Sequence, residues 1–125
     1  MNNSKKHPNL MLIEQIEDPS NLPKNATLFH EDVVWRFFNP KLPDMEGDYA
    51  GLDGIGNFFS KLMNFTEGTF KPNTIRMIPI GSELVLMHNI NELEINGKKE
   101  KFDVALVWRI VDGKIKEIWD IPAVY

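Results

Sequence analysis

The hydrophobic pattern of the chain changes period near its middle. Apolar residues from Ile55 to Met63 recur at positions i, i+3, i+4, i+7 and i+8, which predicts an amphipathic helix. A shorter run with helical spacing begins at Pro8 and stops before Pro19, since proline suits a first helical turn and disfavours the helical backbone before it. Between them, the β-rich residues 33–38 predict one strand. The first half is therefore mainly helical.

After Gly68 the apolar positions alternate, and four strands are predicted over residues 69–79, 83–95, 101–111 and 114–121. Asn96-Gly97 and Asp112-Gly113 favour tight hairpins, so the strands form an antiparallel meander. Long twisted strands beside segregated helices predict an α+β fold, in which a concave, curved sheet packs on the helices and encloses a pocket.

The segment 40–54 separates the first strand from the main helix and is rich in proline, glycine and aspartate. A connection of this length in a compact domain is typical of pocket rims and lids. At its end, Asp53 is expected to cap the helix that follows.

Composition narrows the class of protein. The 125 residues predict one domain over residues 8–125, after a flexible polar leader at 1–7. A net charge of −4 argues against a nucleic-acid partner, and no apolar stretch approaches the roughly 18 residues that span a membrane. The absence of cysteine excludes disulfides and thiolate chemistry and favours a cytoplasmic location. No metal is expected, because the three histidines are scattered without the spacing of metal ligands. No cofactor is expected either, because the sequence lacks a phosphate-binding glycine loop.

Three segments resemble a known family. Residues 28–35 (LFHEDVVW), residues 47–55 (GDYAGLDGI) with the following Phe58-Phe59, and residues 107–115 (VWRIVDGKI) with the following EIWD at 117–120 occur in the order typical of the SnoaL-like branch of the nuclear transport factor 2-like superfamily. The resemblance covers roughly residues 10–125. The first helical region departs from it, because Pro19 and Pro23 break a region that usually holds two fuller helices.

The resemblance implies a cone-shaped sheet, mixed at one edge, around an apolar pocket, and homodimers through the outer sheet face. Relatives include steroid isomerases, polyketide cyclases, epoxide hydrolases and dehydratases, along with proteins that only bind small molecules. Because one fold serves all of these, function depends on the residues of the pocket.

Asp120 is the first catalytic candidate, since the resemblance places an acid/base aspartate on the last strand. If Asp120 points inward beside Ile118, burial raises its pKa toward working pH, which suits a general acid or base. Simple alternation also allows the opposite arrangement, in which Trp119 and Ile121 point inward and Asp120 faces solvent. Both arrangements remain open at this point.

The better-known catalytic sets of the family are incomplete. The base position of the steroid isomerases corresponds to Phe37, and their oxyanion-stabilising acid falls near Leu106. The tyrosine and asparagine of the epoxide hydrolases correspond to Trp35 and Phe37. The resemblance therefore implies neither activity in its usual form.

His88, Asn89 and Asn91 interrupt an otherwise apolar strand. The two asparagines share one face, which the resemblance places inward as substrate-binding residues, and His88 takes the other. An inward His88 would pair with Asp120 for proton transfer, which makes it the second catalytic candidate; an outward one would be structural or lie at a dimer face. The remaining substrate-binding candidates are apolar or aromatic residues that are equally suited to an ordinary core: Trp35, Phe37, Tyr49, Phe59, Trp108 and Ile118, with Trp119 as a further aromatic wall residue.

Three functions are compatible with these residues. The first is a cofactor-free isomerase, cyclase or hydrolase acting on a small apolar or aromatic molecule through Asp120. The second is a dimeric protein that binds such a molecule without changing it, which the missing partners of Asp120 favour. The third is a protein-interaction role through the outer sheet face, where Val107, Arg109 and Val111 are expected.

Overall fold

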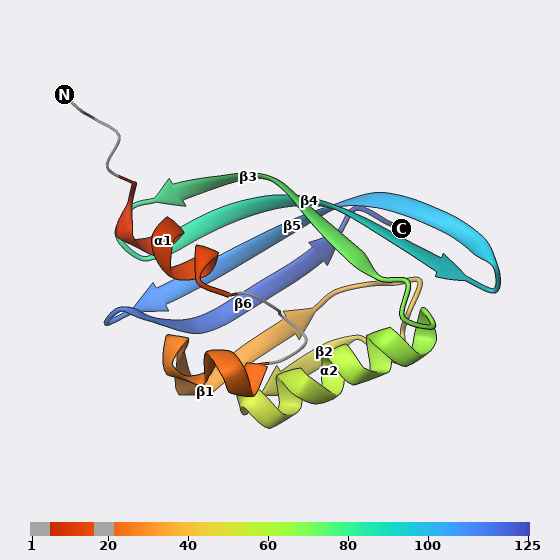
Figure 1. Cartoon of the computed structure of the whole chain (residues 1–125), viewed down its shortest axis with the longest axis horizontal. Coiled ribbons are helices and arrows are strands. Elements are labelled where there is room, and N and C mark those ends of the chain that lie inside the picture. Colours follow the sequence, from red (N-terminus) through yellow and green to blue (C-terminus); the bar gives the residue numbers. More distant parts are fainter. Residues whose placement is uncertain (1–5, 17–21) are drawn as a thin grey trace.

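A computed structural model describes residues 6–16 and 22–125 of the chain. A single twisted sheet forms the body of the protein, and α2 lies across its concave side (Figure 1). The elements in chain order are α1 (Pro8–Glu14), a 3-10 helix η1 (Leu22–Leu28), β1 (Phe29–Phe37), β2 (Gly47–Ala50), α2 (Gly51–Phe65), β3 (Lys71–Ile80), β4 (Leu84–Ile95), β5 (Lys98–Val111) and β6 (Lys114–Pro122).

The sheet has six strands in the order β2-β1-β6-β5-β4-β3. Strands β3 to β6 form the antiparallel meander, and β1 joins β6 in parallel with β2 antiparallel at the edge. The predicted α+β class with a sheet mixed at one edge is therefore confirmed. Both predicted hairpins form, and Asn96-Gly97 has φ values of 54° and 77°, the left-handed backbone that a two-residue hairpin needs.

Helix α2 packs through the stripe predicted from its sequence. Ile55, Phe58, Phe59 and Leu62 are buried against the sheet. The helix begins earlier than expected, at Gly51, and its N-cap is Ala50 without a side-chain bond. The prediction that Asp53 caps the helix is therefore wrong. Asp53 lies in the first turn of α2, where its negative charge interacts favourably with the positive N-terminal end of the helix.

The expected long loop contains the short edge strand β2. Trp35 on β1 lies opposite Tyr49 on β2, so the second half of the loop is held against the sheet. Gly54 brings α2 close to β2, because a Cβ atom there would lie 3.1 Å from the carbonyl carbon of Tyr49. The segment therefore anchors α2 to the sheet edge.

Helix α1 docks at the opposite end of the sheet. His7 caps it by accepting a bond from the Asn9 amide at 3.1 Å, and the Asn9 side chain donates to the Ser82 carbonyl between β3 and β4 at 3.0 Å. The helix ends at Glu14, and the expected stop at Asp18-Pro19 lies outside the described residues. These contacts place α1 beside β3 and β4 (Figure 1).

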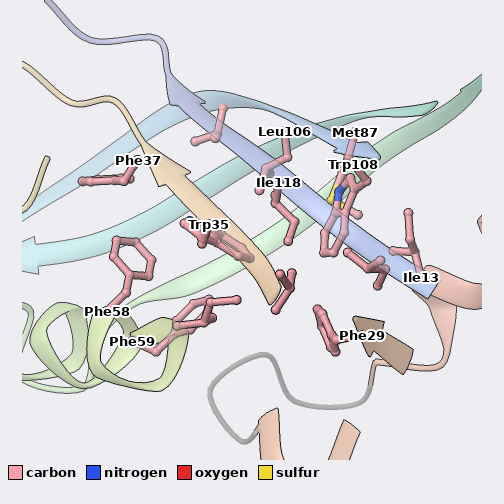
Figure 2. Packing of buried hydrophobic residues seen from close by; sticks show 14 of the residues in the cluster. Ile13, Phe29, Trp35, Phe37, Phe58, Phe59, Met87, Leu106, Trp108 and Ile118 are labelled. Carbon is pink, nitrogen blue, oxygen red and sulfur yellow. The ribbon is translucent and has the colours of Figure 1, made fainter. Parts of the chain in front are cut away.

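An aromatic cluster joins α2 to β1. The ring of Trp35 lies 5.2 Å from that of Phe59, and the ring of Phe37 lies 4.9 Å from that of Phe58. Figure 2 shows the two phenylalanines of α2 facing these β1 side chains. Because aromatic pairs in this arrangement add to ordinary burial, the cluster holds the helix at a fixed distance from the sheet.

Candidate functional site

A pocket of about 550 Å³ opens on the concave face of the sheet. Its described lining comes from α1 and the residues after it, β1, α2, the three central strands and the β3 edge. These lining residues are Ile13, Glu14, Ile16, Trp35, Phe59, Phe70, Pro72, Thr74, Met77, Met87, Asn89, Asn91, Leu106, Trp108 and Asp120. The volume suits a small organic ligand, and the lining is mostly apolar and aromatic.

A β-bulge in β6 turns Asp120 toward this pocket. Arg109 pairs with Glu117, but the next residue, Ile110, pairs with Ile115, so Lys116 is an extra residue in β6. Extra residues of this kind shift the alternation of a strand. Ile115 therefore points inward at one end of β6, and Asp120 points inward at the other.

The same bulge places Trp119 and Ile121 on the outer face. Ile121 is 45% exposed, and the Trp119 ring lies under the Arg109 guanidinium at 5.6 Å. The expectation that Trp119 forms part of the pocket wall is therefore wrong. The extra residue in β6 shifts the alternation of the strand, so that Asp120 points inward and Trp119 points outward.

The Asp120 carboxyl lies among apolar side chains. Phe37 and Leu106, the positions that the resemblance assigns to the base and acid of the steroid isomerases, flank it in register on β1 and β5. Trp35 Nε1 donates a hydrogen bond to Asp120 Oδ2 at 3.2 Å. Burial raises the pKa of Asp120 to about 7, and the Trp35 bond opposes part of that rise by favouring the ionised form.

The described part of the pocket offers Asp120 no cation. The described lining contains no lysine, arginine or histidine, and its other ionisable residue, Glu14, pairs with Lys6 at 2.7 Å. A carboxylate that leaves water without a positive partner is disfavoured, so it takes up a proton instead. The rise in the pKa of Asp120 that burial causes is therefore larger than the fall that the Trp35 hydrogen bond causes.

His88 lies away from Asp120, contrary to its role as second catalytic candidate. It alternates with the inward Asn89 on β4, and its Nε2 lies 2.7 Å from Asp103 Oδ1 on the outer face. Of the two alternatives for His88, the outward one therefore holds, and the pair with Asp120 does not form. Its partner is an exposed carboxylate on the neighbouring strand β5.

The two asparagines do lie in the pocket wall, as the resemblance implied. Asn89 and Asn91 are 7% and 8% exposed. Their Oδ1 atoms and Trp108 Nε1 are buried and have no hydrogen-bond partner within the part of the chain that the structure describes. Buried polar atoms are usually paired, so these three are unusual.

The remaining sequence candidates divide into two groups. Trp35, Phe59 and Trp108 line the pocket, whereas Phe37 lines a smaller cavity of about 40 Å³ beside Asp120. Tyr49 and Ile118 lie outside the described lining of both cavities. The Tyr49 hydroxyl donates to the Met45 carbonyl at 2.6 Å, and Ile118 is fully buried between Trp35 and Trp108.

Two groups of residues in the pocket lining were not foreseen from the sequence. Ile13, Glu14 and Ile16 form one side, and β3 and the residue before it contribute a second group: Phe70, Pro72, Thr74 and Met77. The segment 40–54, expected as a rim, contributes none of the described residues of the large pocket. The helical spacing of apolar residues near Ile13 predicts that this side chain points inward. It does not show whether the side chain packs in the core or lines a pocket.

Within residues 6–16 and 22–125, no three His, Cys, Asp or Glu side chains are grouped as a metal site requires. No helix in that part of the chain is long and apolar enough to span a membrane.

Replacing Trp35 with phenylalanine should raise the pKa of Asp120 further. The variant keeps an aromatic ring against α2 but loses the donor that stabilises the carboxylate. A hydrogen bond to a charged group contributes roughly 1.5–3 kcal/mol, so we expect a rise of about one pH unit or more. Carbon-13 NMR titration of the Asp120 carboxyl measures it, with Trp119→Phe on the outer face as control. An unchanged or lower pKa in Trp35→Phe would show that the bond has no such effect.

Comparison with known proteins places the fold in a family. The SnoaL-like domain matches residues 16–118, and the chain belongs to this family. No curated protein sequence matches the chain at a significant level.

Solved structures with a similar fold share little sequence with the chain. Bal32a, from a soil-derived mobile gene cassette, is 19% identical with a TM-score of 0.78, over 93% of this chain and 89% of that one. TerC, co-crystallised with polyporic acid, is 20% identical with a TM-score of 0.74, over 92% and 91%. A putative SnoaL-like polyketide cyclase from Jannaschia sp. CCS1 is 8% identical with a TM-score of 0.75, over 98% and 90%. At these identities, the likeness establishes the cone fold alone.

Proposed function

We propose that the pocket binds a small, largely apolar molecule and that Asp120 transfers a proton to or from it. The observation that carries this proposal is a buried carboxyl with a pKa of about 7, placed in an aromatic-lined pocket whose described residues supply no cation. A group with this pKa is about half ionised near neutral pH. It therefore can donate or accept a proton at working pH, as an efficient general acid or base must.

The reaction class is a cofactor-free isomerisation, cyclisation or hydrolysis. Proton transfer by one carboxyl is sufficient for such steps when the pocket orients the substrate and excludes water. The polyketide cyclase and TerC, which share the fold, support the idea of a pocket for an organic molecule of this general kind. A cytoplasmic location, which the absence of cysteine favours, is part of the same proposal.

One observation favours a second function, the binding of a small molecule without chemistry. Among the described lining residues, Asp120 has no ionisable neighbour with which to share a proton, because Glu14 is paired with Lys6 and His88 lies outside. A site that needs both an acid and a base is therefore not complete in these residues. This favours binding alone, and it limits any chemistry in the pocket to the transfer of one proton by Asp120.

A probe reaction separates the two functions. The ring opening of 5-nitrobenzisoxazole needs only a base in an apolar site, so it does not depend on knowing the natural substrate. If Asp120 acts as a base, the rate should rise with pH, reach half its maximum near the pKa of about 7, and then level off. A rate equal to that of buffer, or one that climbs without levelling, would favour simple binding.

We also propose that a second copy of the chain covers the outer sheet face. Ile78, Leu86, Val107 and Trp119 form one row in register across β3, β4, β5 and β6 on this face. Ile78 is 42% exposed, and Ile80 and Ile121 beside the row are 48% and 45% exposed. Exposed apolar patches of this kind favour association, and a two-fold pairing would bring the row against itself.

Replacing Val107 with lysine should therefore yield a monomer. The charge would lie in the centre of the row, where a partner copy would remove it from water. Sedimentation velocity at matched concentrations measures the result, with Glu100→Lys at the exposed end of β5 as control. Wild-type protein that sediments as a monomer at every concentration would contradict the proposal.

A further inference from the structure

Two asparagines occupy wall positions where the neighbouring strand carries apolar residues. Asn89 and Asn91 on β4 lie opposite Val104 and Phe102 on β5. A buried amide oxygen without a partner costs roughly 1–3 kcal/mol, and the described residues offer no donor to the Oδ1 atom of Asn89 or of Asn91. Two such costs on one strand of a ligand pocket indicate that the partners come from the ligand.

The register of the sheet places the asparagines on the same inward face as Asp120, two strands away from it. Met87, Leu106 and Asp120 form one row across β4, β5 and β6, and Asn89 begins the adjacent inward row. Two strand spacings separate the backbones of β4 and β6 by about 10 Å. The smaller cavity is lined by both Asn91 and Asp120, so open space extends between the two positions. A flat molecule with one end at Asp120 therefore reaches the asparagines with its other end.

Charge limits what that other end can be. The described lining holds two carboxyls and no basic side chain, so a carboxylate or phosphate would be buried without a counter-ion. An asparagine amide is uncharged, carries both donors and acceptors, and exchanges its oxygen and nitrogen by a half turn of the side chain. A hydroxyl group also donates and accepts, so it can satisfy either end of the amide.

We propose that Asn89 and Asn91 determine specificity by selecting a ligand that has no anionic group and carries hydroxyl groups at the end remote from Asp120. The two side chains are about 6.6 Å apart along the strand, enough for two separate hydrogen-bonding groups. Trp108 Nε1, also without a partner among the described residues, offers a further donor in the pocket, in the row on the other side of Asp120. The inference rests on the proposed ligand-binding function of this pocket and adds the polarity of the ligand to it.

Three probes with the same flat body test the proposal: naphthalene, 2-naphthol and 2-naphthoate, which is an anion at about pH 6. Binding is followed through the indole N–H signals of Trp35 and Trp108, with Trp119 on the outer face as an internal reference. We expect 2-naphthol to bind at least about tenfold more tightly than naphthalene, and 2-naphthoate to bind most weakly. The double variant Asn89→Leu with Asn91→Leu should bind naphthalene at least as well as wild type and lose the preference for 2-naphthol.

The outcomes separate this inference from the proposed function. If wild type binds naphthalene and 2-naphthol equally, or if the double variant keeps the preference, the asparagines do not select the ligand although the pocket still binds it. If 2-naphthoate binds best, the charge argument is wrong. If none of the probes moves the Trp35 and Trp108 signals, the proposed pocket function fails and this inference fails with it. The comparison of probes on wild type needs no variant to fold.

Discussion

Replacing Asp120 with asparagine should abolish proton transfer in the pocket while the fold remains intact. The amide has nearly the same shape, and its oxygen can still accept the Trp35 bond, but it cannot take up a proton near neutral pH. General acid–base catalysis by a placed side chain contributes roughly 10²–10⁴-fold, so the rate of 5-nitrobenzisoxazole ring opening above buffer should fall by at least about a hundredfold.

The matched control for this experiment is Asp103→Asn. Asp103 is an exposed aspartate on the outer face of the adjacent strand, so the same chemical change there should leave the rate within about twofold of wild type. If Asp120→Asn keeps its rate, or if both variants lose it equally, Asp120 is not the base.

The same substitution should change how stability depends on pH. The folded-state pKa of Asp120 is about 7, well above the ordinary value of 3.8 that applies in the unfolded chain. Between these values the unfolded chain gives up the proton while the folded protein keeps it. Wild type should therefore lose stability as pH rises from about 4 to about 7, by about 4 kcal/mol from this group. Asparagine does not titrate, so the variant lacks that loss.

Urea unfolding at about pH 4 and about pH 8 measures the effect. The free energy of unfolding of Asp120→Asn, relative to wild type, should be higher at about pH 8 than at about pH 4 by about 4 kcal/mol. Other carboxylates titrate alike in both proteins, so they cancel in the difference. Asp103→Asn serves as the control, because it makes the same chemical change at an exposed position. A difference that does not vary with pH would contradict the account of a neutral buried carboxyl.

The local parts of the fold could be predicted because their signals are local. Asn96-Gly97 sets a hairpin through its own backbone preferences, and the stripe from Ile55 to Leu62 sets a helix through its spacing. The order of segments around Trp35 and Gly51 was then sufficient for the family. Each of these features depends on a few neighbouring residues, so a single sequence contains enough information to place them.

The direction of the site residues depends on pairing between distant strands. The extra residue Lys116 shifts the alternation of β6, and nothing in β6 alone shows which pairing with β5 produces it. Without that pairing, the sequence does not show which of the two residues, Asp120 or Trp119, points into the pocket. The position of His88 opposite Ala105 on β5 likewise follows from register rather than from residue type. Geometry of this kind can be resolved only once the sheet is assembled.

The α1 and β3 residues of the pocket lining were missed for a related reason. Met77 on β3 reaches the pocket because it lies in register with Met87 on β4, although the two are ten residues apart in a hairpin. Ile13 reaches it because Asn9 fixes α1 to the turn between β3 and β4. Neither side chain differs from an ordinary core residue in the sequence, so its role in a pocket depends on what it faces.

The central claim is that Asp120 is a buried carboxyl poised near neutral pH, and its direct test is carbon-13 NMR titration of that side chain in the wild-type protein. The account predicts a titration midpoint of about 7, far above the usual value of 3.8. It also predicts that the Trp35 indole N–H signal moves with the same midpoint, since Trp35 donates to that carboxyl. A midpoint near 4 with no response at Trp35 would show an ordinary, solvated aspartate and would contradict the proposed acid–base function.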